Sequence, residues 1–134
     1  MTERKKKNQG MNWIAQTTRL AIYLRDGLSC AYCGESVESG AKLTLDHIKP
    51  YSEGGSNAPT NLVTCCHRCN SSRGTRPIRQ FAEGVAAYLN HGATADEIVR
   101  HISNCRRRVL PREEARKMIA RRGSVAKVFE NNCQ

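Results

Sequence analysis

The sequence predicts a small α+β domain stapled by a metal ion, with one helix before it and a helical extension after it. Two Cys-x2-Cys pairs, Cys30/Cys33 and Cys66/Cys69, have the spacing of paired metal knuckles. Hydrophobic residues make up 39% of the 134 residues and aromatic residues only 5%. A core with so few apolar residues needs an additional stabilising element, such as a bound metal ion. Short alternating runs between the two pairs predict strands, and spacings of three and four residues in the second half predict helices.

The N-terminal region divides into a tail and a helix. Residues 1–11 are basic and contain little apolar content, which predicts a disordered tail for phosphate contact or for solubility. In residues 12–26 the apolar positions, Trp13 among them, recur at spacings near three, four and seven. Gly27 then gives a stop signal, so we expect a helix here.

Two short strands are expected at residues 41–49 and 60–65. The first alternates between one face with Leu43, Leu45 and His47 and an opposite face with Thr44 and Asp46. The connection between the strands is rich in Pro, Gly, Ser and Asn, and its double glycine marks a turn. A short helix or turn would follow the second cysteine pair. We therefore expect one module over residues 12–76.

Residues 77–134 are expected to form a basic helical extension. Its first apolar stripe contains Ile78, Phe81, Ala82, Val85, Tyr88 and Leu89. A capping box at Thr94 and Glu97 starts the next helix, whose apolar positions are Ile98, Ile102, Cys105 and Val109. Pro111 starts a third, with Ala115, Met118 and Ile119 on its buried face. These helices would dock on the module, grip a duplex or mediate dimerisation.

The charge balance favours a polyanionic partner. There are 22 Lys and Arg against 12 Asp and Glu, a formal net charge of +10. Nucleic acid is the first candidate and an anionic membrane surface the second. No secretory signal or transmembrane run is recognisable. We therefore expect a reducing compartment, the cytoplasm of a bacterium or of a phage-infected cell, where paired cysteines indicate metal rather than disulfides.

The cysteine pairs predict a structural zinc site. Each pair places two thiolates on a tight turn, and two such turns complete a tetrahedron with no open position. Only Cys66 has the two-residue gap to Cys69, so Cys65 is interpreted as a small buried hydrophobic residue. His67 lies inside the knuckle and is interpreted as an exposed polar residue. Cys105 and Cys133 have no partner at ligand spacing.

The order of motifs resembles the HNH endonuclease family, in its cysteine-knuckle subtype. The resemblance covers about residues 19–76. It is carried by Arg25-Asp26-Gly27, Cys30-x2-Cys33, Leu45-Asp46-His47-Ile48-x-Pro50, Gly54-Gly55, Asn61-Leu62 and Cys66-x2-Cys69-Asn70. It implies a ββα-metal (His-Me finger) fold and hydrolysis of phosphodiester bonds in double-stranded DNA, in proteins frequent among phages and bacteria. Partners from packaging or restriction systems are compatible with such a protein.

The resemblance also implies roles for individual residues. His47 would be the general base, and Asp46 would bind a catalytic divalent ion. Asn61 would fix the loop between the strands and help to orient the histidine. Asn70 stands where the family often has histidine, and it would be the second metal ligand, which makes the sequence an H-N-N variant. Oxygen ligands favour Mg²⁺ or Mn²⁺.

The chemistry accounts for these residue types independently. A neutral imidazole can take a proton from water, typically worth ~10²–10⁴-fold in rate. A divalent ion held by a carboxylate and an amide oxygen keeps positions open for phosphate oxygens and water. Four basic residues are expected around the site: Lys49, Arg68, Arg73 and Arg76. For each of them, contact with a phosphate and simple exposure to solvent are alternative roles. Tyr32 and Tyr51 are interpreted as packing residues rather than base-stacking platforms.

Two other functions share part of this pattern. A non-catalytic zinc-dependent nucleic-acid-binding module would need the cysteines and the basic charge, but it would not need Asp46 or His47. An RNA-directed nuclease would need all of them.

Overall fold

The computed structural model describes residues 13–89 and 92–130. The tail predicted for residues 1–11 and Cys133 lie outside the described residues. The longer elements are α2 (Gln16–Arg25), β1 (Leu43–His47), β2 (Leu62–Cys66), α3 (His67–Arg73), α4 (Ile78–Tyr88), α5 (Ala95–Arg107), α6 (Arg112–Arg122) and α7 (Val125–Glu130). Three short 3₁₀ turns, η1 (Val37–Ser39), η2 (Tyr51–Glu53) and η3 (Pro59–Asn61), lie in the connections.

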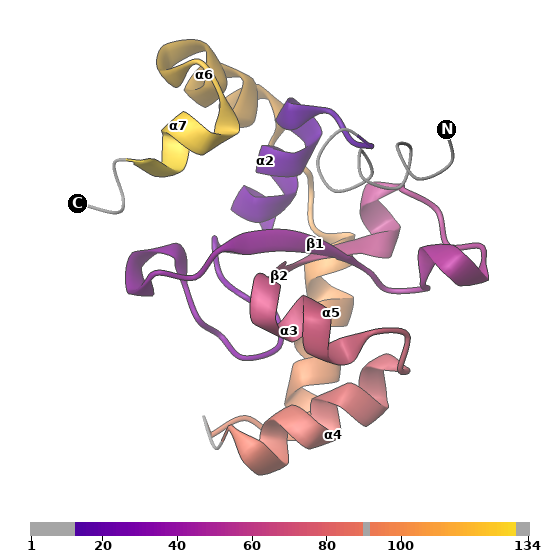
Figure 1. Ribbon diagram of the computed structural model, residues 1–134. Helices are drawn as coiled ribbons and strands as arrows, with labels where there is room; N and C mark the ends of the chain where they lie inside the picture. Colours follow the sequence, from indigo (N-terminus) through magenta and orange to yellow (C-terminus); the bar gives the residue numbers. More distant parts are fainter. Residues whose placement is uncertain (1–12, 90–91, 131–134) are drawn as a thin grey trace, which may run out of the picture.

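The two strands form an antiparallel hairpin, and α3 follows β2 directly (Figure 1). The register pairs Leu43 with Cys66, Leu45 with Thr64 and His47 with Leu62. The predicted α+β class and ββα arrangement are confirmed. The helix after the hairpin begins at His67, earlier than expected.

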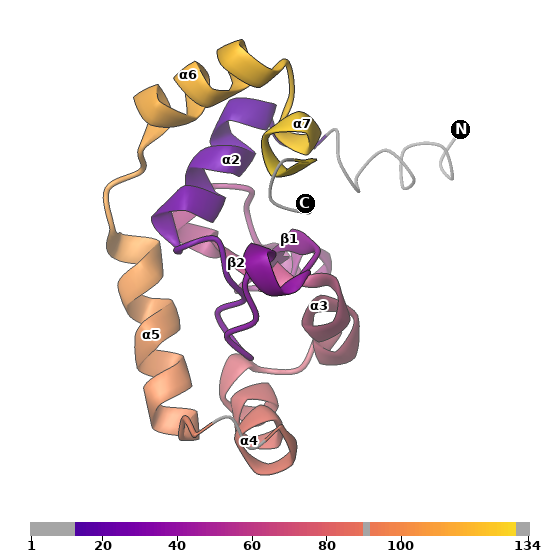
Figure 2. The ribbon, with the colours of Figure 1, turned by 90° about the vertical axis from the view of Figure 1, so that its left-hand side faces the viewer.

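Each face of the hairpin is covered by its own core. On one face, Leu45 and Leu62 pack with α2, α6 and α7. On the other, Val63 and Cys65 pack with the cysteine turns, α4 and α5. Figure 2 shows the sheet between α2, α6 and α7 above and α4 below, with α5 alongside. Of the three roles considered for the helices after residue 77, docking on the hairpin is therefore observed.

The second half follows its predicted pattern except at two helix ends. The capping box is present, with the Thr94 hydroxyl accepting from the Glu97 amide at 3.1 Å and the Glu97 carboxylate accepting from the Thr94 amide at 2.8 Å. Three predicted apolar positions are instead exposed, Tyr88 by 87%, Leu89 by 43% and Val109 by 89%. Tyr88 is the last residue of α4, and α5 ends at Arg107, so both apolar stripes run past the region in which they are covered.

A buried ion pair joins α2 to the hairpin. The Arg25 guanidinium binds the Asp26 carboxylate at 2.7 and 3.1 Å and donates to the carbonyl oxygens of Pro59 at 3.0 Å and Leu62 at 2.7 Å. Asp26 in turn accepts from the Thr64 amide at 2.8 Å. A buried pair with this many additional hydrogen bonds offsets its desolvation cost. The Arg25-Asp26 motif therefore fixes where β2 begins.

The connection between β1 and β2 folds tightly back on itself at Gly55. A Cβ added there would lie 1.8 Å from the Lys49 carbonyl oxygen, well inside van der Waals contact. The Gly55 amide also donates to the Pro50 carbonyl at 3.0 Å. Glycine is needed here for close backbone approach rather than for an unusual φ.

We predict that Gly55→Ala destabilises the protein by ~1–3 kcal/mol, because backbone must move to admit the methyl group. Gly84→Ala is the matched control. Gly84 lies within α4 with no atom near its added Cβ, so the same substitution should stabilise by ~0.5–1 kcal/mol. Thermal unfolding of both variants measures the difference, and equal effects would contradict the close approach at Gly55.

Candidate functional site

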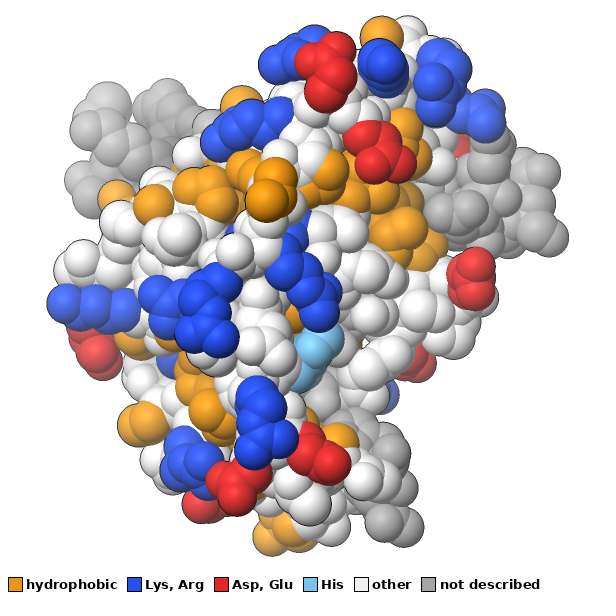
Figure 3. Space-filling view, turned by 180° about the vertical axis from the view of Figure 1, so that it is seen from behind, with side chains coloured by type: hydrophobic (Ala, Val, Ile, Leu, Met, Phe, Trp, Pro, Cys, Tyr) orange, Lys and Arg blue, Asp and Glu red, His pale blue; other side chains and the backbone are white. Residues whose placement is uncertain are grey.

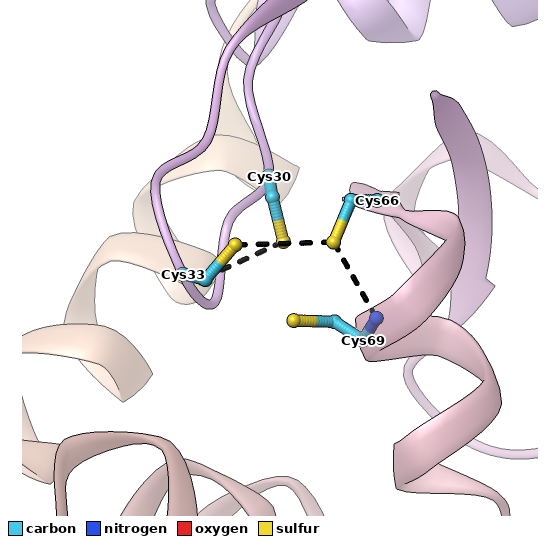
Figure 4. A group of neighbouring side chains, drawn as sticks. All are labelled: Cys30, Cys33, Cys66 and Cys69. Carbon is cyan, nitrogen blue, oxygen red and sulfur yellow. Dashed lines mark hydrogen bonds between the residues drawn. The ribbon is translucent and has the colours of Figure 1, made fainter. Parts of the chain in front are cut away.

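The four cysteines of the two knuckles converge on one point. Cys30 and Cys33 come from the turn after α2, and Cys66 and Cys69 come from the junction of β2 and α3 (Figure 4). All four sulfur atoms lie within 4.8 Å of one another. Backbone amides of Cys33 and Cys69 point at the sulfurs of Cys30 and Cys66, at 3.5 and 3.4 Å. Such bonds stabilise thiolates.

This donor set fits zinc. Tetrahedral Zn–S bonds of ~2.3 Å place sulfur atoms ~3.8 Å apart, and the Cys33 and Cys66 sulfurs lie 3.8 Å apart. A hydrogen bond from Cys69 lowers the pKa of Cys30 to about 5 and raises the pKa of Cys69 well above its usual value. Cys30 is therefore the thiolate of this pair, and binding of a metal ion would release the proton of Cys69. Among the described residues, this is the one group of three or more Cys, His, Asp or Glu whose ligand atoms converge.

The remaining described cysteines and His67 stand outside this centre. Cys65 and Cys105 are fully buried. Burial raises the pKa of Cys65 well above its usual value and that of Cys105 to about 11, so both are neutral, inert thiols. His67 is exposed, and its amide donates to the Lys42 carbonyl at 2.8 Å.

A pocket of about 340 Å³ brings three predicted site residues together. Asp46, His47 and Asn70 share its wall. The first two come from the end of β1, and Asn70 comes from the second turn of α3. The rest of the lining is Trp13, Thr44, Leu45, Pro50, Tyr51, Ser52, Gly74 and Thr75. The hairpin and α3 therefore bring the carboxylate, imidazole and amide into one pocket.

Asp46 is buried and uses one carboxylate oxygen internally. Its Oδ2 accepts from the Tyr32 hydroxyl at 2.6 Å and from Arg73 Nη1 at 2.7 Å. Among the described residues Oδ1 has no donor, which leaves this oxygen available to a ligand. Burial, followed by the neighbouring Asp46 charge, raises the pKa of Tyr32 far above its usual value. Tyr32 therefore stays a neutral donor.

Arg73 does not have the exposed position that phosphate contact requires. It is 2% exposed. Besides Asp46, its guanidinium donates to the carbonyl oxygens of His47 at 2.7 Å, Ile48 at 2.9 Å and Arg76 at 2.7 Å. The expected nucleic-acid contact by Arg73 is wrong for this reason. The side chain instead ties α3 to the end of β1.

The amide of Asn70 has a defined orientation. Its Nδ2 donates to the Leu45 carbonyl at 3.2 Å and lies 3.5 Å from the Thr44 hydroxyl. Because a carbonyl can only accept, the nitrogen must face β1. The amide oxygen is then the atom left for a ligand. Asn70 lies inside α3, so it does not cap that helix.

His47 is held by a residue that the motifs did not single out. Its Nε2 lies 2.8 Å from Asn57 Oδ1. An amide oxygen only accepts, so Nε2 carries the proton and Nδ1 keeps a free lone pair. Trp13 and Tyr51 contact the imidazole, with ring centroids at 4.9 and 5.6 Å. No sequence pattern could say which loop residue would reach the ring.

Asn61 fixes the loop that carries Asn57. Its Oδ1 accepts from the Lys49 amide at 2.9 Å. Its Nδ2 donates to the carbonyl oxygens of Ser56 at 2.8 Å and Lys49 at 3.2 Å. The side chain thus joins the two ends of the connection. Its effect on His47 is indirect, because it acts one residue away from Asn57.

The other three basic residues proposed for phosphate contact are exposed. The side chain of Lys49 is exposed to solvent in the β1–β2 connection. Arg68 makes a long ion pair of 3.6 Å with Glu35. Arg76 hydrogen-bonds to the carbonyls of Ser72 and Arg73 and lies 5.4 Å from the centre of the Phe81 ring. Their exposure is compatible with phosphate contact, which stays a prediction.

A further basic groove lies where the end of α5 meets η3. Its volume is about 560 Å³, and its lining is Thr60, Ser103, Arg106, Arg107 and Arg108. None of these described lining residues carries a carboxylate. Figure 3, which views the molecule from behind, shows Lys and Arg side chains gathered across the middle of the face that α5 occupies. Positive charge is therefore present on the side away from α3.

Comparisons with known proteins find a family model and curated relatives with similar sequences. Residues 30–76 match the family model described as HNH endonuclease. Over 79 residues, 58% of this chain, the sequence is 35% identical to a CRISPR-associated endonuclease Cas9 of Corynebacterium diphtheriae, of which the match covers 7%. Over 66 residues it is 40% identical to the Cas9 of Actinomyces naeslundii, covering 48% of this chain and 6% of that protein.

A solved structure gives a weaker likeness. The crystal structure of the Type II-C Cas9 enzyme from Actinomyces naeslundii aligns with a TM-score of 0.42 and 24% identity, covering 81% of this chain and 13% of that one. The chain thus spans under a tenth of the length of its two curated relatives. The hairpin, helix and cysteine centre define a zinc-knuckle ββα module. Within it, residues 30–76 are the part that is similar to the HNH endonuclease family.

We predict that the purified protein carries one zinc ion and that Cys69→Ser loses it and unfolds, since zinc binding in small modules supplies ~10 kcal/mol or more of folding free energy. Elemental analysis and circular dichroism measure the two effects. Cys65→Ala is the matched control, because this neighbouring buried thiol lies outside the centre. Full zinc occupancy in Cys69→Ser, or its loss in Cys65→Ala, would contradict the assigned ligands.

We predict that Asn57→Ala exposes the Nε2 proton of His47 to solvent, because the amide oxygen that accepts from it at 2.8 Å is removed. Proton–nitrogen correlation NMR of the imidazole at one fixed pH measures the change, which should appear as a shifted or exchange-broadened Nε2–H signal. Asn104→Ala, on an exposed part of α5, removes the same side chain elsewhere and should leave the signal in place. An unmoved signal in Asn57→Ala would mean that Asn57 does not contact the ring.

Proposed function

We propose that this chain is a metal-dependent endonuclease that hydrolyses DNA phosphodiester bonds, with His47 as the general base and one divalent ion held by Asp46 and Asn70. The observation that carries the proposal is the shared pocket of these three side chains. The match to the HNH endonuclease model supports the nuclease class.

His47 is suited to proton transfer. With Nε2 donating to Asn57, the lone pair of Nδ1 takes the proton of an attacking water. The two aromatic contacts restrict the ring, so that the base does not have to be oriented during the reaction. Asn61 keeps the loop of Asn57 in place.

Asp46 and Asn70 would hold the ion through Oδ1 of each side chain. A hard ion such as Mg²⁺ or Mn²⁺, when bound, supplies polarisation of the phosphate and stabilisation of the leaving oxyanion. Arg73 shares the Asp46 carboxylate and so lowers the negative charge available to the ion. We infer a weakly held, exchangeable ion, in contrast to the closed cysteine centre.

DNA is the proposed substrate class on grounds of charge. The net charge of +10, the basic groove and the exposed Lys49, Arg68 and Arg76 suit a phosphate backbone. The curated relatives are named as CRISPR-associated endonucleases.

No helix of the described residues has the length and apolarity needed to cross a membrane.

One observation favours the alternative, a non-catalytic nucleic-acid-binding module. The Asp46 carboxylate has a structural role, because it neutralises the buried guanidinium of Arg73. A chain that only bound nucleic acid would keep this pair for stability. Such a chain would bind DNA in a salt-dependent way and cut neither DNA nor RNA with any divalent ion.

We predict that the zinc-loaded protein cleaves plasmid DNA with Mg²⁺ or Mn²⁺, and that His47→Ala lowers the rate by ~10²–10⁴-fold while keeping fold and zinc, because only the general base is removed. His67→Ala, an exposed histidine in the knuckle, is the control and should cleave like the parent. Gel assays with plasmid and with RNA measure rate and substrate preference. Parent-like cleavage by His47→Ala would overturn the assignment of His47 as the base. Faster cleavage of RNA than of DNA would favour the alternative of an RNA-directed nuclease.

A further inference from the structure

A small cavity lies beside His47, and the proposed hydrolysis leaves its volume unused. It measures about 210 Å³ and is lined by Trp13, His47, Tyr51 and Asn57. Trp13, His47 and Tyr51 also line the larger pocket of Asp46 and Asn70. The small cavity therefore adjoins the place where a scissile phosphate would sit. We call this cavity the aromatic slot.

Tyr51 is more exposed than a residue that serves packing alone. It lies in η2 and is 55% exposed, whereas Tyr32, the other tyrosine given a packing role, is 1% exposed. A large aromatic ring left half in water next to a cavity has a free face for stacking. Tyr51 therefore packs against His47 with part of its surface and leaves the rest to solvent.

The slot also contains a polar group with unused hydrogen-bonding capacity. Asn57 Oδ1 is occupied by His47. Among the described residues its Nδ2 has no acceptor, and Asn57 is exposed. Two N–H donors are thus available beside the aromatic rings. Aromatic faces combined with an amide donor suit a flat heterocycle with acceptor atoms on its edge.

We propose that the aromatic slot binds an unstacked nucleobase next to the phosphate under attack, so that the chain prefers single-stranded or locally opened nucleic acid. The proposal rests on the proposed function for the position of that phosphate. A base inside a duplex has both faces covered by its neighbours and cannot stack on Tyr51. A base in a single strand can, and stacking of this kind tolerates any sequence.

Trp13 provides a direct readout, because it is the single tryptophan of the chain. Zinc-loaded protein without added divalent ion would be titrated with a short single-stranded DNA, its duplex, and an abasic strand of equal length and charge. We expect the single strand to change tryptophan fluorescence and to bind at least tenfold more tightly than the abasic strand. Equal binding and equal fluorescence change with the abasic strand would overturn the slot, since charge alone would then account for binding.

Variants of Tyr51 test the stacking surface. Tyr51→Ala should weaken single-strand binding tenfold or more, whereas Tyr51→Phe should bind like the parent because the ring face is kept. Tyr88→Ala is the matched control, because Tyr88 is an exposed tyrosine at the end of α4. Parent-like binding by Tyr51→Ala, or an equal loss in Tyr88→Ala, would overturn the role of Tyr51.

The slot and the nuclease activity can fail separately. Base-dependent binding without cleavage in Mg²⁺ or Mn²⁺ would support the slot and reject the hydrolase. Cleavage that is equally fast on matched duplex and single strand, with no loss on the abasic strand, would support the hydrolase and reject the slot.

Discussion

The cysteine centre is the constraint on which the remaining geometry depends. Cys66 ends β2 and its sulfur also accepts from the first turn of α3. Cys69 lies one residue before Asn70. A metal that fixes these two sulfurs therefore fixes both the angle between strand and helix and the position of the Asn70 amide. A zinc ion bound at the cysteines would take no part in the proposed chemistry. It would nevertheless set the position of Asn70, one of the two proposed ligands of the catalytic ion.

The alternation of a β-strand divides the proposed work between two cores. Asp46 points into the core of the cysteine turns, α4 and α5, where Tyr32 and Arg73 hold it. His47 follows on the opposite side, next to Trp13, which packs with the core of α2, α6 and α7. One peptide bond thus separates the proposed metal ligand from the proposed base, and their side chains are held by different partners. The helices after residue 77 matter to both, because they complete each core.

Local sequence patterns predicted what local forces decide. The strands, the knuckle spacing, the capping box at Thr94 and the buried face of α5 all follow from short-range periodicity or hydrogen bonding, and the structure has them. The short α7 and the exposure of Val109 depend on where a helix stops being covered, which no periodicity encodes. Arg73 was misjudged because its helix carries polar neighbours. Its burial is explained by acceptors 25 to 27 positions away, the carboxylate of Asp46 and the carbonyl groups of His47 and Ile48. Asn57 and Trp13 were missed for the same reason.

The Asp46–Arg73 pair limits how mutagenesis of this site can be interpreted. Removing the carboxylate leaves a guanidinium buried without its counter-ion, and breaking such a pair costs ~3–5 kcal/mol. Loss of activity in Asp46→Ala would then mix a missing metal ligand with a loosened junction between β1 and α3. Asp46→Asn retains an oxygen for Arg73 and removes the charge, so the pair of variants separates the two effects. A substitution at Asn70, whose bonds to β1 are weaker, probes metal binding with less structural damage.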